Sequence, residues 1–103
     1  MAFDLRLDIR VHEDIENATD YYFEKSVKVA EAFYDDIQNA YLALQKNPFF
    51  QFRYLDYRCL PLKVFPFMFH FTVNEKKKVV YIHALISTAK NPAKSWLKSK
   101  GGK

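Results

Sequence analysis

The stretch Phe3-Asp-Leu-Arg-Leu-Asp-Ile-Arg-Val-His-Glu-Asp-Ile-Glu-Asn-Ala-Thr-Asp-Tyr-Tyr22 changes its hydrophobic period near the middle. In residues 3–11 apolar side chains alternate with charged ones, which is typical of a strand with one buried face. From His12 onward the apolar residues recur at helical spacing, at Ile15, Ala18 and Tyr22. The pattern therefore predicts a strand over 4–11 that leads into a helix over 12–26.

A second helix is predicted over 28–46. Its apolar residues form one stripe, made of Val29, Phe33, Ile37, Ala40 and Leu44. Ser26 can cap its beginning, and Asn47-Pro48 ends it because the residue before a proline avoids the α conformation. Asp35 and Asp36 lie off the stripe, and we expect both carboxylates to face solvent. Two helices joined by so short a connection pack as an antiparallel hairpin.

The remainder of the chain has the alternation of β-strands. We predict strands over 56–64, 66–74 and 78–86, with a hairpin turn at Asn74-Glu-Lys-Lys77. The order β-α-α-β-β-β indicates an α+β fold in which a helical hairpin covers one face of an antiparallel sheet. The residues expected in the core are Phe33, Ile37, Leu44, Leu60, Leu62, Phe69 and Phe71.

Length and composition indicate a single domain over 1–97, followed by a flexible basic tail over 98–103. The one cysteine, Cys59, excludes a disulfide within the chain and favours a reducing compartment. The apolar run from Val64 to Phe69 is far shorter than the ~20 residues of a membrane-spanning helix, and the N-terminus has no signal-peptide pattern. We therefore expect a cytoplasmic protein without a membrane segment.

Charge and aromatic content both point to a macromolecular partner. Lys and Arg number 16 against 12 Asp and Glu, which gives a net charge of +4 and favours an acidic partner or a nucleic acid. Aromatic residues make up 17% of the chain, more than so small a core readily encloses. An exposed apolar surface of this kind marks a partner site.

Four motifs in order give the chain a resemblance to the RelE/ParE toxins of type II toxin–antitoxin systems, and to the ParE-like members in particular. They are the acidic, aromatic first helix (Glu13-Asp-Ile-Glu-Asn-Ala-Thr-Asp-Tyr-Tyr22), the end of the second helix (Leu42-Ala-Leu-Gln-Lys-Asn-Pro48), the strand Phe65-Pro-Phe-Met-Phe-His-Phe-Thr-Val73, and the closing Ser87-Thr-Ala-Lys-Asn-Pro92 with Trp96. The resemblance spans Leu5 to Leu97. It implies a growth-inhibiting toxin that is held by a cognate antitoxin in a hetero-oligomer, with DNA gyrase as the target of ParE members.

The same resemblance separates the chain from the mRNA-cleaving RelE toxins. The two catalytic lysines of those toxins fall at Cys59 and Pro61, the central arginine at Met68, and a later arginine near Ala89 or Lys90. Cleavage of a phosphodiester without a metal needs cations to stabilise the charge that develops on the phosphate. Neutral residues at three of these positions favour a toxin that is not an enzyme.

Sheet parity leaves another catalytic arrangement open. If Phe67, Phe69 and Phe71 face the helices, then an open opposite face carries His70, Tyr81 and His83, together with Tyr57 and Cys59. Two histidines could act as general acid and base in a ribosome-dependent ribonuclease. A zinc site at Cys59, His70 and His83 lacks a fourth ligand and ligand spacing, so no metal or cofactor is expected. The simplest interpretation of this face is a docking surface.

Three hypotheses therefore remain: a ParE-like toxin, a ribosome-dependent ribonuclease that uses His70, His83 and Tyr81, and a non-toxic homologue that binds only its antitoxin. In each, an acidic antitoxin tail is expected along the hairpin and sheet. Its carboxylates would meet basic residues, mainly raising the association rate. The predicted partner-binding residues are Arg53, Arg58, Lys63, Lys90, Lys94 and Trp96.

Overall fold

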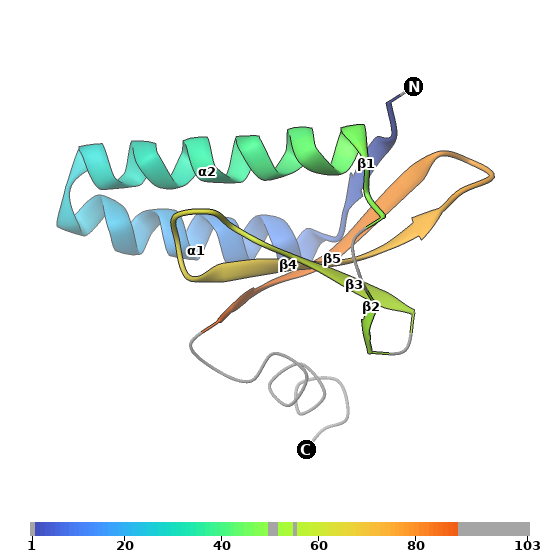
Figure 1. Cartoon of the computed structure of the whole chain (residues 1–103). Coiled ribbons are helices and arrows are strands. Elements are labelled where there is room, and N and C mark those ends of the chain that lie inside the picture. Colours follow the sequence, from blue (N-terminus) through green and yellow to red (C-terminus); the bar gives the residue numbers. More distant parts are fainter. Residues whose placement is uncertain (1, 50–51, 55, 89–103) are drawn as a thin grey trace, which may run out of the picture.

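The computed structural model describes residues 2–49, 52–54 and 56–88, with the backbone alone for 52–54. Two helices lie side by side over a sheet (Figure 1). The elements are β1 (Asp4–Leu7), α1 (Ile9–Lys25), α2 (Val27–Lys46), β2 (Phe52–Tyr54), β3 (Tyr57–Pro61), β4 (Phe67–Asn74) and β5 (Val79–Ser87). The predicted helical hairpin on one face of a sheet is confirmed.

Within the described residues, five strands form one sheet in the order β1-β5-β4-β3-β2. The pairs β2–β3, β3–β4 and β4–β5 are antiparallel, as predicted. The pair β1–β5 is parallel, with Asp4 opposite Val79 and Leu7 opposite Ile82, so the sheet is mixed and the prediction of a fully antiparallel sheet is wrong in this one pair. The reason is that alternation reveals a strand and its buried face, whereas the neighbour and its direction depend on distant parts of the chain.

The first helix begins earlier than the sequence pattern predicts. Asp8 is its N-cap, and one side-chain oxygen accepts a hydrogen bond from the backbone N–H of Arg10 at 2.9 Å. Ile9 and Val11 therefore belong to α1, where Ile9 is exposed and Val11 is fully buried. The strand predicted over 4–11 ends at Leu7 because a capping aspartate stands inside the alternating run.

The boundaries of α2 follow the local signals. The Ser26 hydroxyl accepts a hydrogen bond from the backbone N–H of Val29 at 3.2 Å, and Asn47 caps the other end directly before Pro48. The short strand β2 was not predicted, and residues 56–64 contribute a strand of only five residues, Tyr57–Pro61. The predicted hairpin turn is present, since the backbone N–H of Lys77 donates to Oδ1 of Asn74 at 3.0 Å.

The core lies between the helical hairpin and the sheet. Of the seven residues predicted to be buried, Leu60 is half-buried and packs against the core; the fully or nearly fully buried ones are Phe33, Ile37, Leu44, Leu62, Phe69 and Phe71. An aromatic cluster joins both helices to the sheet side of the molecule. The ring centroid of Phe33 lies 5.2 Å from that of Tyr22, 5.3 Å from that of Phe65 and 5.7 Å from that of Phe67.

No helix in the described ranges is long and apolar enough to cross a membrane. The predicted tail over 98–103 lies outside the described residues, as does the end of the predicted domain after residue 88.

Candidate functional site

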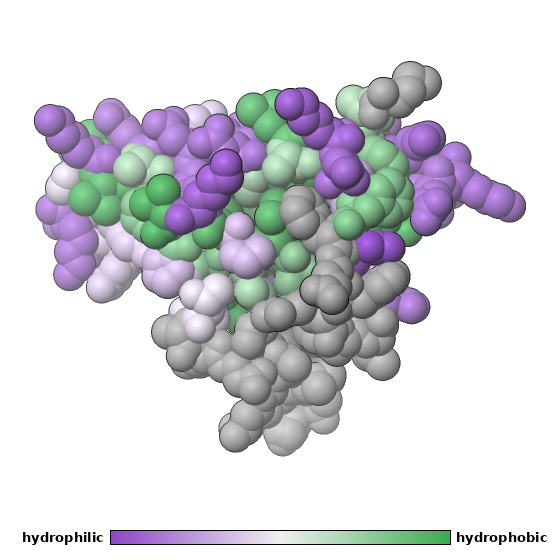
Figure 2. Space-filling view, viewed as in Figure 1, coloured by the Kyte–Doolittle hydropathy of each residue, from purple (hydrophilic) through white to green (hydrophobic). Residues whose placement is uncertain are grey.

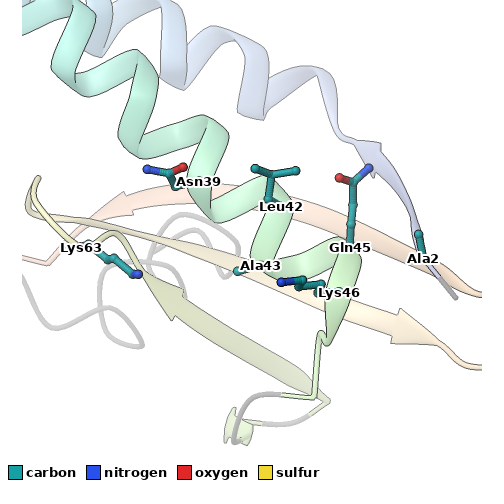
Figure 3. Close-up of a pocket in the computed structure, with 7 residues that line it drawn as sticks. All are labelled: Ala2, Asn39, Leu42, Ala43, Gln45, Lys46 and Lys63. Carbon is teal, nitrogen blue, oxygen red and sulfur yellow. The ribbon is translucent and has the colours of Figure 1, made fainter.

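A groove runs beside the C-terminal half of α2 and has a volume of about 930 Å³ (Figure 3). It is lined by Ala2, Asn39, Leu42, Ala43, Gln45, Lys46 and Lys63. The Leu42 side chain is 60% exposed, although it is large and apolar. Figure 2 shows that apolar side chains reach the surface in patches among polar ones along the hairpin. The groove thus offers apolar contact area to a partner.

The charges around this groove are positive. Among the described residues, Lys46 and Lys63 line it and no carboxylate does. Neither lysine has an ion-pair partner among the described residues. Phe49 lies three residues after the end of α2, and the guanidinium carbon of Arg58 lies 5.5 Å from the centroid of its ring. This end of the molecule is suited to an amphipathic segment that carries carboxylates.

Lys63 is fixed to α2 through its backbone. Its N–H donates to Oδ1 of Asp36 at 3.2 Å, while the N–H groups of Val64 and Phe65 donate to Oδ2 at 2.9 and 2.8 Å. Asp36 is only 4% exposed, so the expectation that it faces solvent is wrong. Because these hydrogen bonds join residues 27–29 positions apart, the helical pattern alone could not reveal them.

The opposite face of the sheet is not open at its centre, contrary to the sequence-based expectation. His70 is fully buried, and Cys59, Met68 and Ala84 are 6%, 4% and 2% exposed. The prediction that Cys59 and His70 share one face is confirmed, since Cys59 stands opposite His70 with Sγ 3.7 Å from Nδ1. A general acid or base must come within hydrogen-bond distance of its substrate, and His70 has no exposed surface in this structure.

The second predicted histidine is more accessible. His83 is half-buried, and its Nε2 lies 2.9 Å from Oγ1 of Thr72, at hydrogen-bond distance. Its ring packs edge-on against that of Tyr57, with the centroids 5.2 Å apart. Tyr81 pairs with Thr72 in the sheet and is also half-buried. The sheet thus brings Thr72, His83, Tyr57 and Tyr81 to one region. Lys76 lines a shallow pocket together with Thr72 and Tyr81.

Tyr41 is half-buried and packs against the core. Burial raises the pKa of its phenol to about 12. The ring stacks on Phe69 with the centroids 5.6 Å apart.

The predicted partner-binding residues divide into two groups. Lys63 lines the groove, and Arg58 lies over the ring of Phe49. The side chain of Arg53 and all of Lys90, Lys94 and Trp96 lie outside the described residues. Sequence reasoning missed Leu42 and Lys46, although Leu42 had a signal: it is apolar and lies off the buried stripe of α2. No group of metal-ligating side chains occurs in the part of the chain that the structure describes.

Comparison with known proteins gives structural matches only. No family model and no curated protein matches the sequence. A chain of the chromosomal ParDE TA system from P. aeruginosa is similar with a TM-score of 0.68 and 20% identity, over 84% of this chain and 96% of that one. The isolated E. coli RelE toxin is similar with a TM-score of 0.60 and 14% identity, over 96% and 98% of the two chains.

A double arginine-to-alanine mutant of the E. coli toxin RelE in the free state has a TM-score of 0.61 and 16% identity, over 92% of this chain and 93% of that one. These matches extend over nearly the whole length of each compared chain, and they agree with the element order described above. This chain has the RelE/ParE toxin fold.

Proposed function

We propose that this protein is the toxin of a type II toxin–antitoxin system, that it inhibits growth by binding a cellular target, and that a cognate antitoxin neutralises it. The single observation that carries the proposal is the similarity to a chain of a ParDE system over 84% of this chain. The target proposed from the resemblance to ParE members is DNA gyrase.

The groove beside α2 supports a protein partner. Its exposed Leu42 supplies apolar area, and the cations of Lys46 and Lys63 stand at its edge. An amphipathic antitoxin segment would cover Leu42 with an apolar side chain and place carboxylates beside the lysines. Arg53, Lys90, Lys94 and Trp96 remain proposed contacts of the same partner.

Two features favour a toxin that does not cut RNA. Cys59, Pro61 and Met68 stand where the resemblance would place two lysines and an arginine, and they bring no positive charge. His70, which could substitute for them as an acid or base, is fully buried. Phosphodiester cleavage by the RelE arrangement would therefore have no positive charge at these three positions, and its alternative would have to use a buried His70.

Binding is the first test of the proposal. If a short reading frame adjoins the gene of this chain, the chain would be co-expressed with its product, and the purified pair would be studied by calorimetry. We expect a dissociation constant well below about 1 µM, which corresponds to about −8.2 kcal/mol. A chain that stays monomeric and soluble at high concentration, and that binds this product with micromolar or weaker affinity, would contradict the proposal.

Two assays then separate the targets. In a supercoiling assay with purified gyrase, we expect the chain to inhibit and the antitoxin to restore activity. In primer extension on translating ribosomes, we expect no codon-phased cuts. Cuts that disappear with His83→Ala or His70→Ala would instead establish the ribonuclease alternative.

A further inference from the structure

The carboxylate of Asp36 holds three consecutive backbone N–H groups, those of Lys63, Val64 and Phe65. The three distances lie between 2.8 and 3.2 Å, and the carboxylate is 4% exposed. Hydrogen bonds to a charged acceptor are stronger than those between neutral groups. Asp36 therefore fixes the connection between β3 and β4 to the side of α2.

The fixed segment carries side chains that a partner can reach. Lys63 is exposed and lines the groove, and Val64 is 74% exposed despite being apolar. Figure 3 shows Lys63 across the groove from Asn39 and Leu42 of α2. Each side of the groove thus comes from a different part of the chain, and in the described structure Asp36 is hydrogen-bonded to the segment that carries Lys63.

We propose that Asp36 is a positioning residue for partner binding: by clamping residues 63–65, it holds Lys63 in place to contact a carboxylate of an acidic, amphipathic antitoxin segment in the groove. This inference rests on the proposed function and adds to it the residue that orders the binding surface. A segment that is ordered before binding loses less conformational entropy on association than a mobile one. The saving in conformational entropy matters most for Lys63, since a flexible lysine on a mobile loop makes a weak contact.

The substitution Asp36→Asn is the sharpest perturbation because it changes one oxygen into an amide nitrogen. The amide has a single acceptor oxygen, which suits the position of Oδ2 with its two short hydrogen bonds from Val64 and Phe65. The NH₂ group then faces the N–H of Lys63, and two donors repel each other. Asp36→Asn is therefore expected to remove the hydrogen bond from the N–H of Lys63 and to keep those from Val64 and Phe65.

Amide exchange measured by NMR on the chain alone tests the clamp. We expect exchange of the Lys63 amide to accelerate by about tenfold in Asp36→Asn, the effect of losing one hydrogen bond to a charged acceptor. Asp35→Asn is the matched control, because it removes the same charge from the adjacent, exposed position and should leave these amides unchanged. Equal exchange in the two variants would overturn the clamp.

A double-mutant cycle on binding tests the role in recognition, with the product of the adjoining reading frame as the probe. Lys63→Gln should weaken binding about threefold in the wild-type background, as expected for an exposed ion pair. The same substitution should have almost no effect in the Asp36→Asn background, and a full effect in the Asp35→Asn background. A merely structural role for Asp36 predicts the same effect of Lys63→Gln in all three.

The outcomes separate this inference from the proposed function. If the wild-type chain does not bind the probe, the proposed function is wrong and the inference is wrong with it. If the wild type binds and the effects of the two substitutions are additive, only the inference is overturned. If Asp36→Asn does not fold, Lys63→Gln alone decides: unchanged affinity would refute the contact, and a loss that shrinks at high salt would support it.

Discussion

Truncation of Phe33 is expected to destabilise the fold more than any change on the surface of the hairpin. Phe33 is fully buried on α2, and its ring contacts those of Tyr22 on α1, Phe65 before β4 and Phe67 on β4 at centroid distances of 5.2–5.7 Å. The substitution Phe33→Ala removes the ring that joins both helices to the sheet side. It leaves a cavity that the three surrounding rings can fill only in part.

The magnitude follows from burial and from the ring contacts. Phenylalanine-to-alanine changes in a core cost about 3–5 kcal/mol, and the three ring contacts place this residue in the upper part of that range. A domain of this length has a total stability of about 5–15 kcal/mol. We therefore expect Phe33→Ala to lose about 4 kcal/mol and to lower the melting temperature on the order of 20 °C.

Urea unfolding monitored by circular dichroism measures this loss. The matched control is Phe23→Ala, since Phe23 is the same residue type at 59% exposure on the neighbouring helix. The control should stay within about 0.5 kcal/mol of the wild type. If the two variants unfold at the same urea concentration, the aromatic cluster does not join hairpin and sheet as described.

Three further predictions concern single residues. Burial raises the pKa of Asp14, which accepts a hydrogen bond from the backbone N–H of Leu85 at 3.4 Å. Folding therefore favours the protonated form of Asp14, and this contribution to stability is lost as the pH rises through the raised pKa. Asp14→Asn should remove that part of the pH dependence in urea titrations from pH 3 upward. Burial raises the pKa of Tyr41 to about 12, so its contribution to stability is complete below pH 10 and lost between pH 10 and 12. In an ultraviolet titration, Tyr41→Phe should therefore leave the number of tyrosines that ionise near pH 10 unchanged. One tyrosine fewer near pH 10 would show that the pKa of Tyr41 is not raised. Asp8→Ala removes the cap that accepts from the backbone N–H of Arg10 and should cost about 1 kcal/mol in thermal unfolding, whereas no measurable loss would refute its capping role.

The elements that the sequence predicted well are those set by neighbouring residues. The stripe of α2 with Phe33, Ile37 and Leu44 gave its buried face, and Asn47-Pro48 gave its end at Lys46. The alternation in β4 identified Phe69 and Phe71 as core residues. Each of these signals is complete within a few positions of the chain, so it does not depend on the rest of the fold.

The features that the sequence did not predict depend on distant contacts or on competing local signals. Asp8 stands inside an alternating run, so its role as a cap was hidden by the strand pattern. The parallel pairing of β1 with β5 and the burial of His70 both depend on tertiary packing. The helical pattern around Asp36 predicts an exposed carboxylate, because its three hydrogen-bond donors lie about 28 residues away in the sequence.

The candidate site was therefore predicted only in part. Lys63 and Arg58 were predicted from their charge; Lys63 lines the groove, and Arg58 lies over the ring of Phe49. The apolar part of the groove, at Leu42, was not predicted: the position of Leu42 off the buried stripe of α2 indicates that it is exposed, but single exposed leucines on helices are common. The groove is a candidate binding surface because the fold brings Leu42, Lys46 and Lys63 close together.

A toxin of this kind arrests growth unless its antitoxin is present. The most direct measurement is a colony count after inducible expression of the chain alone, and after co-expression with the product of the adjoining reading frame. We expect colonies to be lost with the chain alone and to be restored by co-expression. Unchanged colony counts in cells that accumulate the soluble chain alone would contradict it.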